Sequence, residues 1–314
     1  MNTRTAEEKI SGSGLAFAVS SYVLWGFLPL FFITLAPSGA VEIVSWRIVL
    51  SLVFCALLVT VTRGWGRFRA IATDRRLLGN LALAAVFILV NWLVYIFATL
   101  SGHVVEAALG YFTNPIVTVL LGVLVLRERL RPAQWVAIGV SVVAVLVLAI
   151  GYGSFPWIAI SLAFSFGLYG LVKKQVGPKV DAVSGLTIET AYLAPAASIA
   201  LIVIALQGDL TMGTVSVWHT VLLLLAGVLT AVPLLLFASG ARRLPLVYMG
   251  LVQYFAPVLQ LIIGAWIMHE AMPPARWAGF AIVWVALVIL SFDGLRHGTR
   301  QRAAALATTP EGAP

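Results

Sequence analysis

The sequence is poor in charged residues and contains a single cysteine. Only 10% of its 314 residues are charged, 20 Lys or Arg and 12 Asp or Glu, whereas soluble domains carry about 25%. A water-soluble chain of this length could not cover its surface with so few charges, so the ordinary globular classes are excluded. The one cysteine, Cys55, excludes an intramolecular disulfide and gives no indication of a redox site or a cysteine-based zinc site.

Hydrophobic residues, in contrast, make up 61% of the sequence, and the mean hydropathy is +1.03. They form continuous runs of about 20 residues, the length that spans a bilayer as a helix. The runs lack the alternation of a barrel strand, so a transmembrane β-barrel is excluded. The sequence predicts ten transmembrane helices, over residues 15–35, 41–62, 77–100, 104–126, 133–150, 156–172, 185–206, 218–238, 245–268 and 276–292.

The formal net charge of +8 reflects where the basic residues lie. Lys and Arg occur in short groups between the hydrophobic runs rather than in a stripe, which argues against a nucleic-acid partner and for contact with the lipid bilayer. With the N-terminus in the cytoplasm, 18 of the 20 lie on the cytoplasmic side, all except Arg47 within a run and Arg276 outside. The positive-inside rule therefore predicts a multi-pass protein of the cell (inner or plasma) membrane with both termini cytoplasmic.

A shift of 142 residues superposes two parts of the chain. Matching residues are Leu109, Pro115, Gly122, Glu128, Pro132, Ala133 and Trp135 with Leu251, Pro257, Gly264, Glu270, Pro274, Ala275 and Trp277. The chain is predicted to be a duplicated unit of five spans, with repeats over residues 14–150 and 155–294 and a disordered cytoplasmic tail over 295–314. Because five is odd, the second unit must be inverted. We therefore expect an all-α integral membrane protein with ten transmembrane helices in two inverted five-helix repeats.

Inverted repeats are typical of secondary transporters that work by alternating access. The sequence has no G-x-x-x-x-G-K-[ST] phosphate loop, which argues against an ATP-driven pump. It also has no G-x-S-x-G or H-E-x-x-H motif, so an enzyme, with catalytic residues facing one cavity, is the least favoured class. A membrane channel or a sensor stays open as the alternative to a carrier.

Polar residues inside the spans mark the candidate site, because a charge at the bilayer centre costs at least about 2.5 kcal/mol. Arg47 and Glu189 occupy equivalent positions at the 142-residue shift, and Pro115 and Pro257 interrupt two equivalent spans. The candidate substrate-binding residues are Asn91, Tyr95, Tyr111, Asn114, Gln253, Tyr254 and Arg47. The candidate proton-coupling residues are His103, Glu106 and Glu189. Glu42, Glu128 and Glu270 lie at span ends, where capping or loop anchoring is favoured.

Several motifs in order resemble the RarD branch of the EamA family, within the drug/metabolite transporter superfamily, whose members are often labelled chloramphenicol-sensitive proteins. They are Glu42 with Trp46-Arg47-Ile48, Asn91-Trp92-Leu93-Val94-Tyr95, Gly102-His103-Val104-Val105-Glu106, Leu109-Gly110-Tyr111-Phe112-Thr113-Asn114-Pro115, Glu128-Arg129-Leu130 with Gln134-Trp135, Gly185-Leu186-Thr187-Ile188-Glu189, Pro233-Leu234, and Gln253-Tyr254 with Pro257. The resemblance runs from about Leu15 to Phe292, although Trp46 stands where the branch commonly has His. It implies a ten-helix inner-membrane carrier with a central cavity and names no substrate.

Together these features predict a secondary active transporter of a small polar or amphipathic organic metabolite, more readily an exporter than an importer. The expected partners are that small-molecule substrate and the bilayer. Whether the protein forms a homodimer is left open. No cofactor, metal or catalytic residue is expected.

Overall fold

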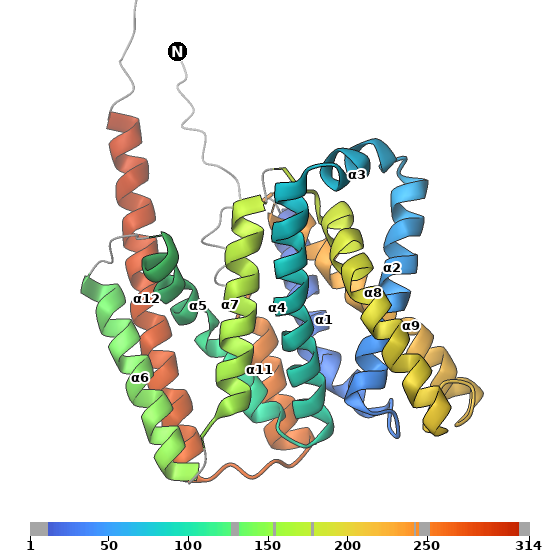
Figure 1. Cartoon of the computed structure of the whole chain (residues 1–314). Helices are drawn as coiled ribbons and strands as arrows, with labels where there is room; N and C mark the ends of the chain where they lie inside the picture. Colours follow the sequence, from blue (N-terminus) through green and yellow to red (C-terminus); the bar gives the residue numbers. More distant parts are fainter. Residues whose placement is uncertain are drawn as a thin grey trace, which may run out of the picture.

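The computed structural model describes residues 12–126, 132–152, 155–176, 179–241, 243–244 and 252–307, and within these ranges the secondary structure is helical without strands. The helices stand side by side and most run between the same two ends of the molecule (Figure 1). They are α1 Gly12–Ile33, α2 Ala40–Val61, α3 Trp65–Ala72, α4 Arg75–Leu100, α5 Val104–Leu126, α6 Pro132–Tyr152, α7 Trp157–Val176, α8 Ala182–Gln207, α9 Val217–Ala241, α11 Phe255–Ile262 and α12 Pro274–Ala307. A π-helical turn, Ile263–Ile267, continues α11.

Seven of the described helices are long and apolar enough to cross a bilayer. The qualifying stretches are Gly12–Ile33, Ala40–Val61, Arg75–Leu100, Val104–Leu121, Ala182–Gln207, Val217–Phe237 and Pro274–Asp293. Shorter apolar helices occupy Pro132–Val147, Trp157–Lys173 and Phe255–Ile267. Large apolar side chains such as Leu57, Ile199 and Val285 are exposed on the flanks, as lipid-facing residues would be. The chain is a multi-pass membrane protein, and ten spans stay a prediction.

Several helices begin and end where local chemistry requires it. Asp74 caps α4 by accepting hydrogen bonds from the backbone N–H groups of Arg76, at 2.9 Å, and Leu77, at 3.1 Å. Asp181 caps α8 in the same way through Ser184 N–H, at 3.0 Å. At its other end α8 stops at Gly208, whose φ of +82° is a left-handed conformation that glycine adopts without strain.

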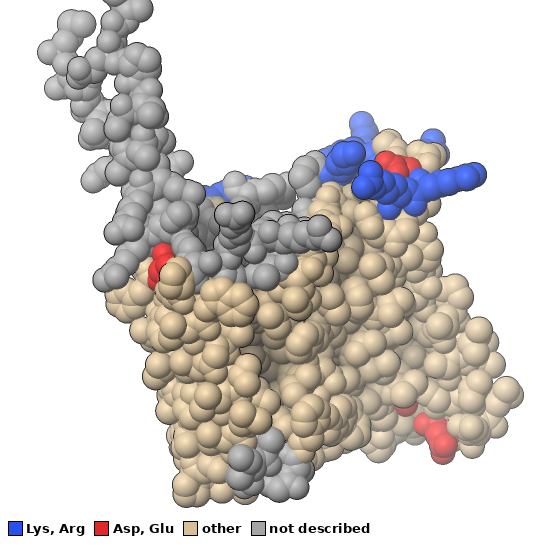
Figure 2. Space-filling model, turned by 60° about the vertical axis from the view of Figure 1, so that its left-hand side comes forward, with Lys and Arg blue, Asp and Glu red and all other residues tan. Residues whose placement is uncertain are grey.

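The two ends of the bundle differ in charge. An apolar cluster that includes Ile71 of α3, Leu81 of α4, Val176 of α7 and Ile188 of α8 closes one of them, which we name the α3 end. Figure 2 shows the Lys and Arg side chains gathered at this end, whereas the flank below it carries other residues. This asymmetry agrees with the positive-inside pattern of the sequence.

The helices of the two halves are interleaved. We name α1 to α6 the first half and α7 to α12 the second half. α1 packs on α9 and α4 packs on α7, α1 contacts α11 and α5 contacts α7, and α2 contacts α9 while α4 contacts α8. Three further pairs join equivalent helices, namely α2 with α8, α5 with α11 and α6 with α12. The main contacts made by one half are thus matched by equivalent contacts of the other.

The structure adds three details that the hydrophobic runs do not indicate. α3 is an eight-residue helix in a gap between spans, where no element was expected. α12 continues to Ala307, past residue 295 where the tail was expected to begin. Its last turns, over residues 300–307, are rich in Ala and Arg, which favour helix. α7 runs to Val176 and therefore includes Lys173, which sequence reasoning assigned to a loop.

Candidate functional site

Arg47 is a buried cation on α2, with only 4% of its surface exposed. Its Nε donates a hydrogen bond to Oγ1 of Thr230 on α9, at 2.5 Å. The guanidinium carbon lies 4.4 Å from the ring centroid of Trp92 and 5.6 Å from that of Phe32. Among the described residues, its Nη1 has no hydrogen-bond partner and no Asp or Glu forms an ion pair with it. Ring faces and one hydroxyl therefore hold this charge, with no counter-charge beside it.

A hydrogen-bonded set of aromatic and amide groups adjoins Arg47. Tyr111 Oη donates to Asn91 Oδ1 at 3.0 Å, and Asn91 Nδ2 donates to Ser165 Oγ at 3.1 Å and to the Leu162 carbonyl at 3.3 Å. The ring of Tyr95 meets that of Tyr111 edge-on, with centroids 5.5 Å apart, and the buried Tyr95 Oη has no partner in the described part of the chain. Both tyrosines lie within electrostatic range of the Arg47 charge. We name the group of Phe32, Arg47, Asn91, Trp92, Tyr95, Tyr111 and Thr230 the Arg47 cluster.

The Arg47 cluster is assembled by both halves of the chain. α1, α2, α4 and α5 provide six of its members, and α9 provides Thr230. Asn91 also reaches across to α7 through Ser165. Burial is nearly complete, because Phe32, Arg47, Asn91, Trp92, Tyr95 and Thr230 are all at most 6% exposed. In this conformation these six side chains are almost fully buried, whereas Tyr111 is half-buried.

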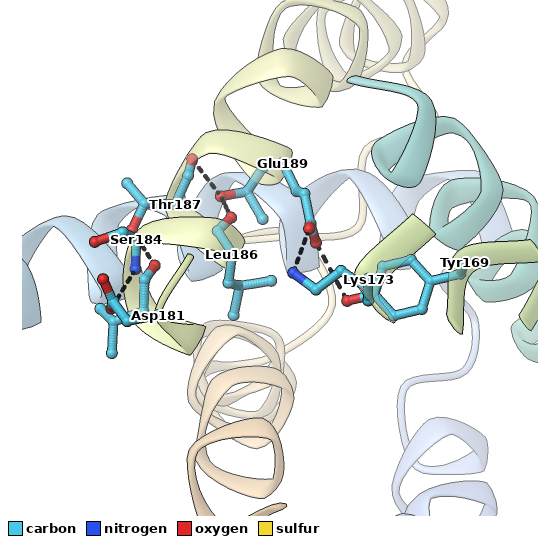
Figure 3. A network of polar contacts seen from close by, with 9 residues as sticks. Tyr169, Lys173, Asp181, Ser184, Leu186, Thr187 and Glu189 are labelled. Atoms are coloured by element: carbon cyan, nitrogen blue, oxygen red, sulfur yellow. Dashed lines mark hydrogen bonds and ion pairs between the residues drawn. The ribbon is translucent and has the colours of Figure 1, made fainter. Parts of the chain in front are cut away.

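Glu189, the counterpart of Arg47 in the repeat, has its own partners. Its carboxylate is 1% exposed and accepts a hydrogen bond from Lys173 Nζ at 2.7 Å and one from Tyr169 Oη at 3.3 Å. Figure 3 shows both partners approaching Glu189 from α7. Sequence reasoning selected Glu189 for proton coupling and gave it no partner. The structure neutralises Glu189 with Lys173, inside the second half.

Glu270 connects the two halves at the end of the bundle opposite to α3. Its two carboxylate oxygens accept hydrogen bonds from the backbone N–H groups of Val104, at 2.5 Å, and Val105, at 3.0 Å, the first residues of α5. Burial raises the pKa of Glu270 above its ordinary value, although both N–H groups and the nearby His103 favour the charged form. Capping by Glu270 matches the expectation from sequence, whereas its repeat counterpart Glu128 lies outside the described residues.

Glu106 binds the backbone at the start of α7 in the same way that Glu270 binds the start of α5. Its Oε1 accepts hydrogen bonds from the backbone N–H groups of Ile158, at 3.1 Å, and Ala159, at 3.4 Å. His103 donates to or accepts from Ser101 Oγ at 3.1 Å. It is close enough to act electrostatically on Glu106, but no hydrogen bond joins the two side chains in the described structure. These two proton-coupling candidates thus lie at the opposite end from Lys173 and Glu189.

Glu42 anchors a loop at this same end. It accepts hydrogen bonds from the N–H and hydroxyl groups of Thr211, at 3.0 and 2.9 Å, and from Met212 N–H at 3.3 Å. The neighbouring surface holds a pocket of about 520 Å³ between the start of α2 and the end of α8. Glu42 is therefore bound by backbone N–H groups and by the Thr211 hydroxyl, as its position at a span end led us to expect.

The remaining candidates do not join the Arg47 cluster. Tyr254 packs on Phe112, with ring centroids 6.4 Å apart, in a separate apolar cluster with Phe280. Gln253 precedes Tyr254 and interacts with it. Asn114 is buried one turn beyond Tyr111, and its Oδ1 has no partner in the described ranges. Of the seven substrate-binding candidates, the structure brings together Arg47, Asn91, Tyr95 and Tyr111.

Sequence reasoning did not select Thr230, Trp92, Phe32 or Lys173 for the site. Thr230 carries a weak signal, since it is a lone polar residue one turn before Pro233 in an apolar run. Trp92 adjoins the selected Asn91, but aromatic residues in a membrane protein usually belong to packing or to the interfacial belts. Phe32 is indistinguishable from other apolar residues, so only the structure could assign it.

Comparison with known proteins bears on this arrangement of helices and buried polar groups. The EamA-like transporter family matches the chain twice, over residues 12–150 and 155–292. The chain belongs to this family. The two EamA-like matches account for nearly all of the described helices.

The relatives of this EamA-like chain include proteins named RarD and proteins named as transporters. Protein RarD from Streptomyces exfoliatus is 50% identical over 298 residues, covering 95% of this chain and 94% of the relative. Uncharacterized transporter YojE from Bacillus subtilis (strain 168) is 40% identical, with 90% and 95% covered. Protein RarD from Escherichia coli (strain K12) is 37% identical, with 92% and 97% covered. The chain therefore falls in the RarD branch.

A solved structure, described only as "Crystal structure of protein", is similar to the EamA-like chain with a TM-score of 0.57. It covers 88% of this chain and 96% of that one at 16% sequence identity. At that identity the similarity extends to the fold alone.

Proposed function

We propose that this RarD-branch protein is a secondary active transporter that exports a small polar or amphipathic organic metabolite. In the proposal the chain has ten transmembrane helices in two inverted repeats, over residues 14–150 and 155–294. Both termini lie on the cytoplasmic side of the cell membrane, and the α3 end of the bundle faces the cytoplasm. The membership of the family and the names of the relatives support transport in general.

One observation carries the proposal furthest, namely the hydrogen bond between Arg47 and Thr230. This bond joins the first half to the second within a buried polar and aromatic cluster. An intramembrane charge costs free energy, so a charge kept there usually marks a functional site. Transporters built from inverted repeats place their substrate site at the interface between the repeats. The Arg47 cluster occupies such an interface.

The reciprocal packing of the halves supports alternating access. Because α1 contacts α9 as α4 contacts α7, and α2 contacts α9 as α4 contacts α8, the two halves can exchange conformations and open the opposite end of the bundle. In the structure, Glu270 and Glu106 bind backbone groups across helices at the end opposite to α3. We assign proton coupling, as part of the proposal, to His103, Glu106 or Glu189.

Solute flux in proteoliposomes tests the proposal. The purified protein is reconstituted and offered a broad panel of amino acids, amines, organic acids and nucleotide precursors. We expect saturable uptake of at least one class, and faster uptake of labelled solute when unlabelled solute is preloaded, which a carrier shows and a channel does not. Absence of protein-dependent flux across the whole panel would contradict the proposal.

A further inference from the structure

The two buried charges at equivalent places in the repeats differ in one respect. Glu189 is neutralised by Lys173, with their charged atoms 2.7 Å apart. Arg47 has no acidic neighbour in the described structure, and its Nη1 donates to nothing. A buried ion without a counter-ion is unfavourable, and Arg47 is 4% exposed. Within the described residues, Arg47 is therefore a buried positive charge without a counter-charge.

The chemistry of the free groups indicates what would balance it. A guanidinium presents its N–H groups in a planar fork that fits a carboxylate. Nε is already used by Thr230, and Nη1 is a buried donor without a partner in the described structure. Tyr95 Oη is a second buried polar group without a partner among the described residues. Both groups can donate hydrogen bonds to an oxyanion, and neither is a carboxylate that could pair with a cation.

The charge of Arg47 also restricts which class of ligand would fit the site. One negative charge would neutralise Arg47, whereas a dicarboxylate or a phosphate dianion would leave an excess negative charge in the low-dielectric site. A zwitterion would bring an ammonium group for which the described residues around Arg47 offer no free carboxylate, because Glu189 is paired with Lys173. The rest of the ligand would lie against the rings of Phe32, Trp92 and Tyr95, which surround the cation.

We infer that Arg47 binds the carboxylate of a small organic monocarboxylate with an apolar or aromatic body, and that such an anion is the substrate. This inference rests on the transport function proposed above and names its substrate class. Binding replaces an unbalanced buried charge with an ion pair. Hence the loaded site is neutral when the halves exchange conformations.

The experiment uses matched probes that differ only in charge. Three series share a methyl, an isobutyl or a benzyl body: lactate, 2-hydroxyisocaproate and 3-phenyllactate are compared with their amides, with alanine, leucine and phenylalanine, and with the corresponding amines. Uptake into proteoliposomes is measured for the wild-type protein. We expect the monocarboxylate to be transported at least tenfold faster than the amide, zwitterion and amine in at least one series.

Substitutions at Arg47 test whether transport of the monocarboxylate depends on this residue. Arg47→Gln should lower uptake of the preferred monocarboxylate at least tenfold, and Arg47→Lys should lower it less because the charge is kept. Lys179→Gln, which removes an exposed cation, is the matched control and should change uptake less than twofold. The probe series needs only the wild-type protein, so the inference stays testable if Arg47→Gln does not fold.

The outcomes separate this inference from the general function. Transport of amides, zwitterions or amines as fast as the monocarboxylates in every active series overturns the inference and leaves the transporter intact. The inference is also overturned if other solutes of the broad panel are transported and none of the monocarboxylates is. It is overturned as well if a folded Arg47→Gln variant takes up the monocarboxylate as fast as the wild-type protein. If no solute of either panel moves, the proposed transport function itself fails.

Discussion

Thr230 accepts the single hydrogen bond that Arg47 makes within the described residues. The hydroxyl donates in turn to the Ala226 carbonyl of its own helix, at 2.7 Å. It is thus oriented to present a lone pair to Nε. A side chain of the same shape without the oxygen would leave a buried charged donor unsatisfied.

We expect Thr230→Val to lower the free energy of unfolding by about 1 to 3 kcal/mol, the typical cost of losing a hydrogen bond to a charged group. Thermal and denaturant unfolding of the purified protein in detergent measure it. Thr190→Val is the matched control, because the Thr190 hydroxyl is also buried but bonds only carbonyls of its own helix. Equal losses in the two variants would show that Arg47 does not depend on Thr230.

A second prediction at the residue scale concerns the contribution of the Lys173–Glu189 ion pair to the free energy of unfolding. Lys173→Met leaves Glu189 buried and uncompensated, which should cost about 1 to 3 kcal/mol, less than for a fully buried pair, because Lys173 is 28% exposed. Adding Glu189→Gln should recover at least half of the loss. A double-mutant cycle on the unfolding free energy measures the coupling. Additive effects of the two substitutions would contradict the pairing.

Sequence reasoning selected some residues of the site and not others for a physical reason. Arg47 and Asn91 are polar groups in apolar runs, and their cost in a membrane reveals them from sequence alone. The partners of Arg47 could not be selected, because Thr230 lies 183 residues away and only packing brings α2 to α9. The partner of Glu189 could not be selected either, because Lys173 was assigned to a loop.

At the scale of elements, the hydrophobic runs predicted most helices closely. The expected spans 41–62 and 104–126 are α2, Ala40–Val61, and α5, Val104–Leu126. Apolar length determines these helices, so the sequence shows them directly. α3 was not predicted because its eight residues are too few and too basic to form such a run. The relative placement of helices depends on close contacts at small residues, which hydropathy does not reveal.

Gly227 of α9 makes one of these contacts. A Cβ added there would lie 2.6 Å from the backbone of Leu50 on α2, close to the hydrogen bond from Ser51 Oγ to the Gly227 carbonyl, at 3.2 Å. Gly227→Ala should therefore force α2 from α9 and destabilise the fold by about 1 to 3 kcal/mol.

The control for this contact is a glycine with free space around it. Gly79 of α4 has nothing within 4 Å of an added Cβ, so Gly79→Ala should stabilise by up to about 1 kcal/mol through helix propensity. Unfolding midpoints of the two variants are compared in the same detergent. Shifts of the same sign and size would mean that α2 and α9 are not in close contact at Gly227.

At the scale of the whole molecule, the charge asymmetry predicts the orientation in the membrane. Single cysteines are introduced at Arg67 in α3 and at Val215 before α9, which are exposed near opposite ends of the bundle. Both are made in a Cys55→Ala background. A membrane-impermeant maleimide applied to spheroplasts should label the Val215→Cys variant alone, and both variants after permeabilisation. Labelling of Arg67→Cys in sealed spheroplasts would reverse the orientation.

The interleaving of the halves also constrains how the protein is made. Thr230 leaves the ribosome after Arg47 by 183 residues, an interval of about 10 to 40 s at typical rates of synthesis. Trp92 arrives much earlier and its ring can cover the guanidinium in the meantime. Because α1, α2 and α4 have their main partners in the second half, a nascent chain stopped after α6 would display incomplete helix surfaces. We expect a chain truncated after α6 to be degraded by membrane quality-control proteases faster than the full-length protein.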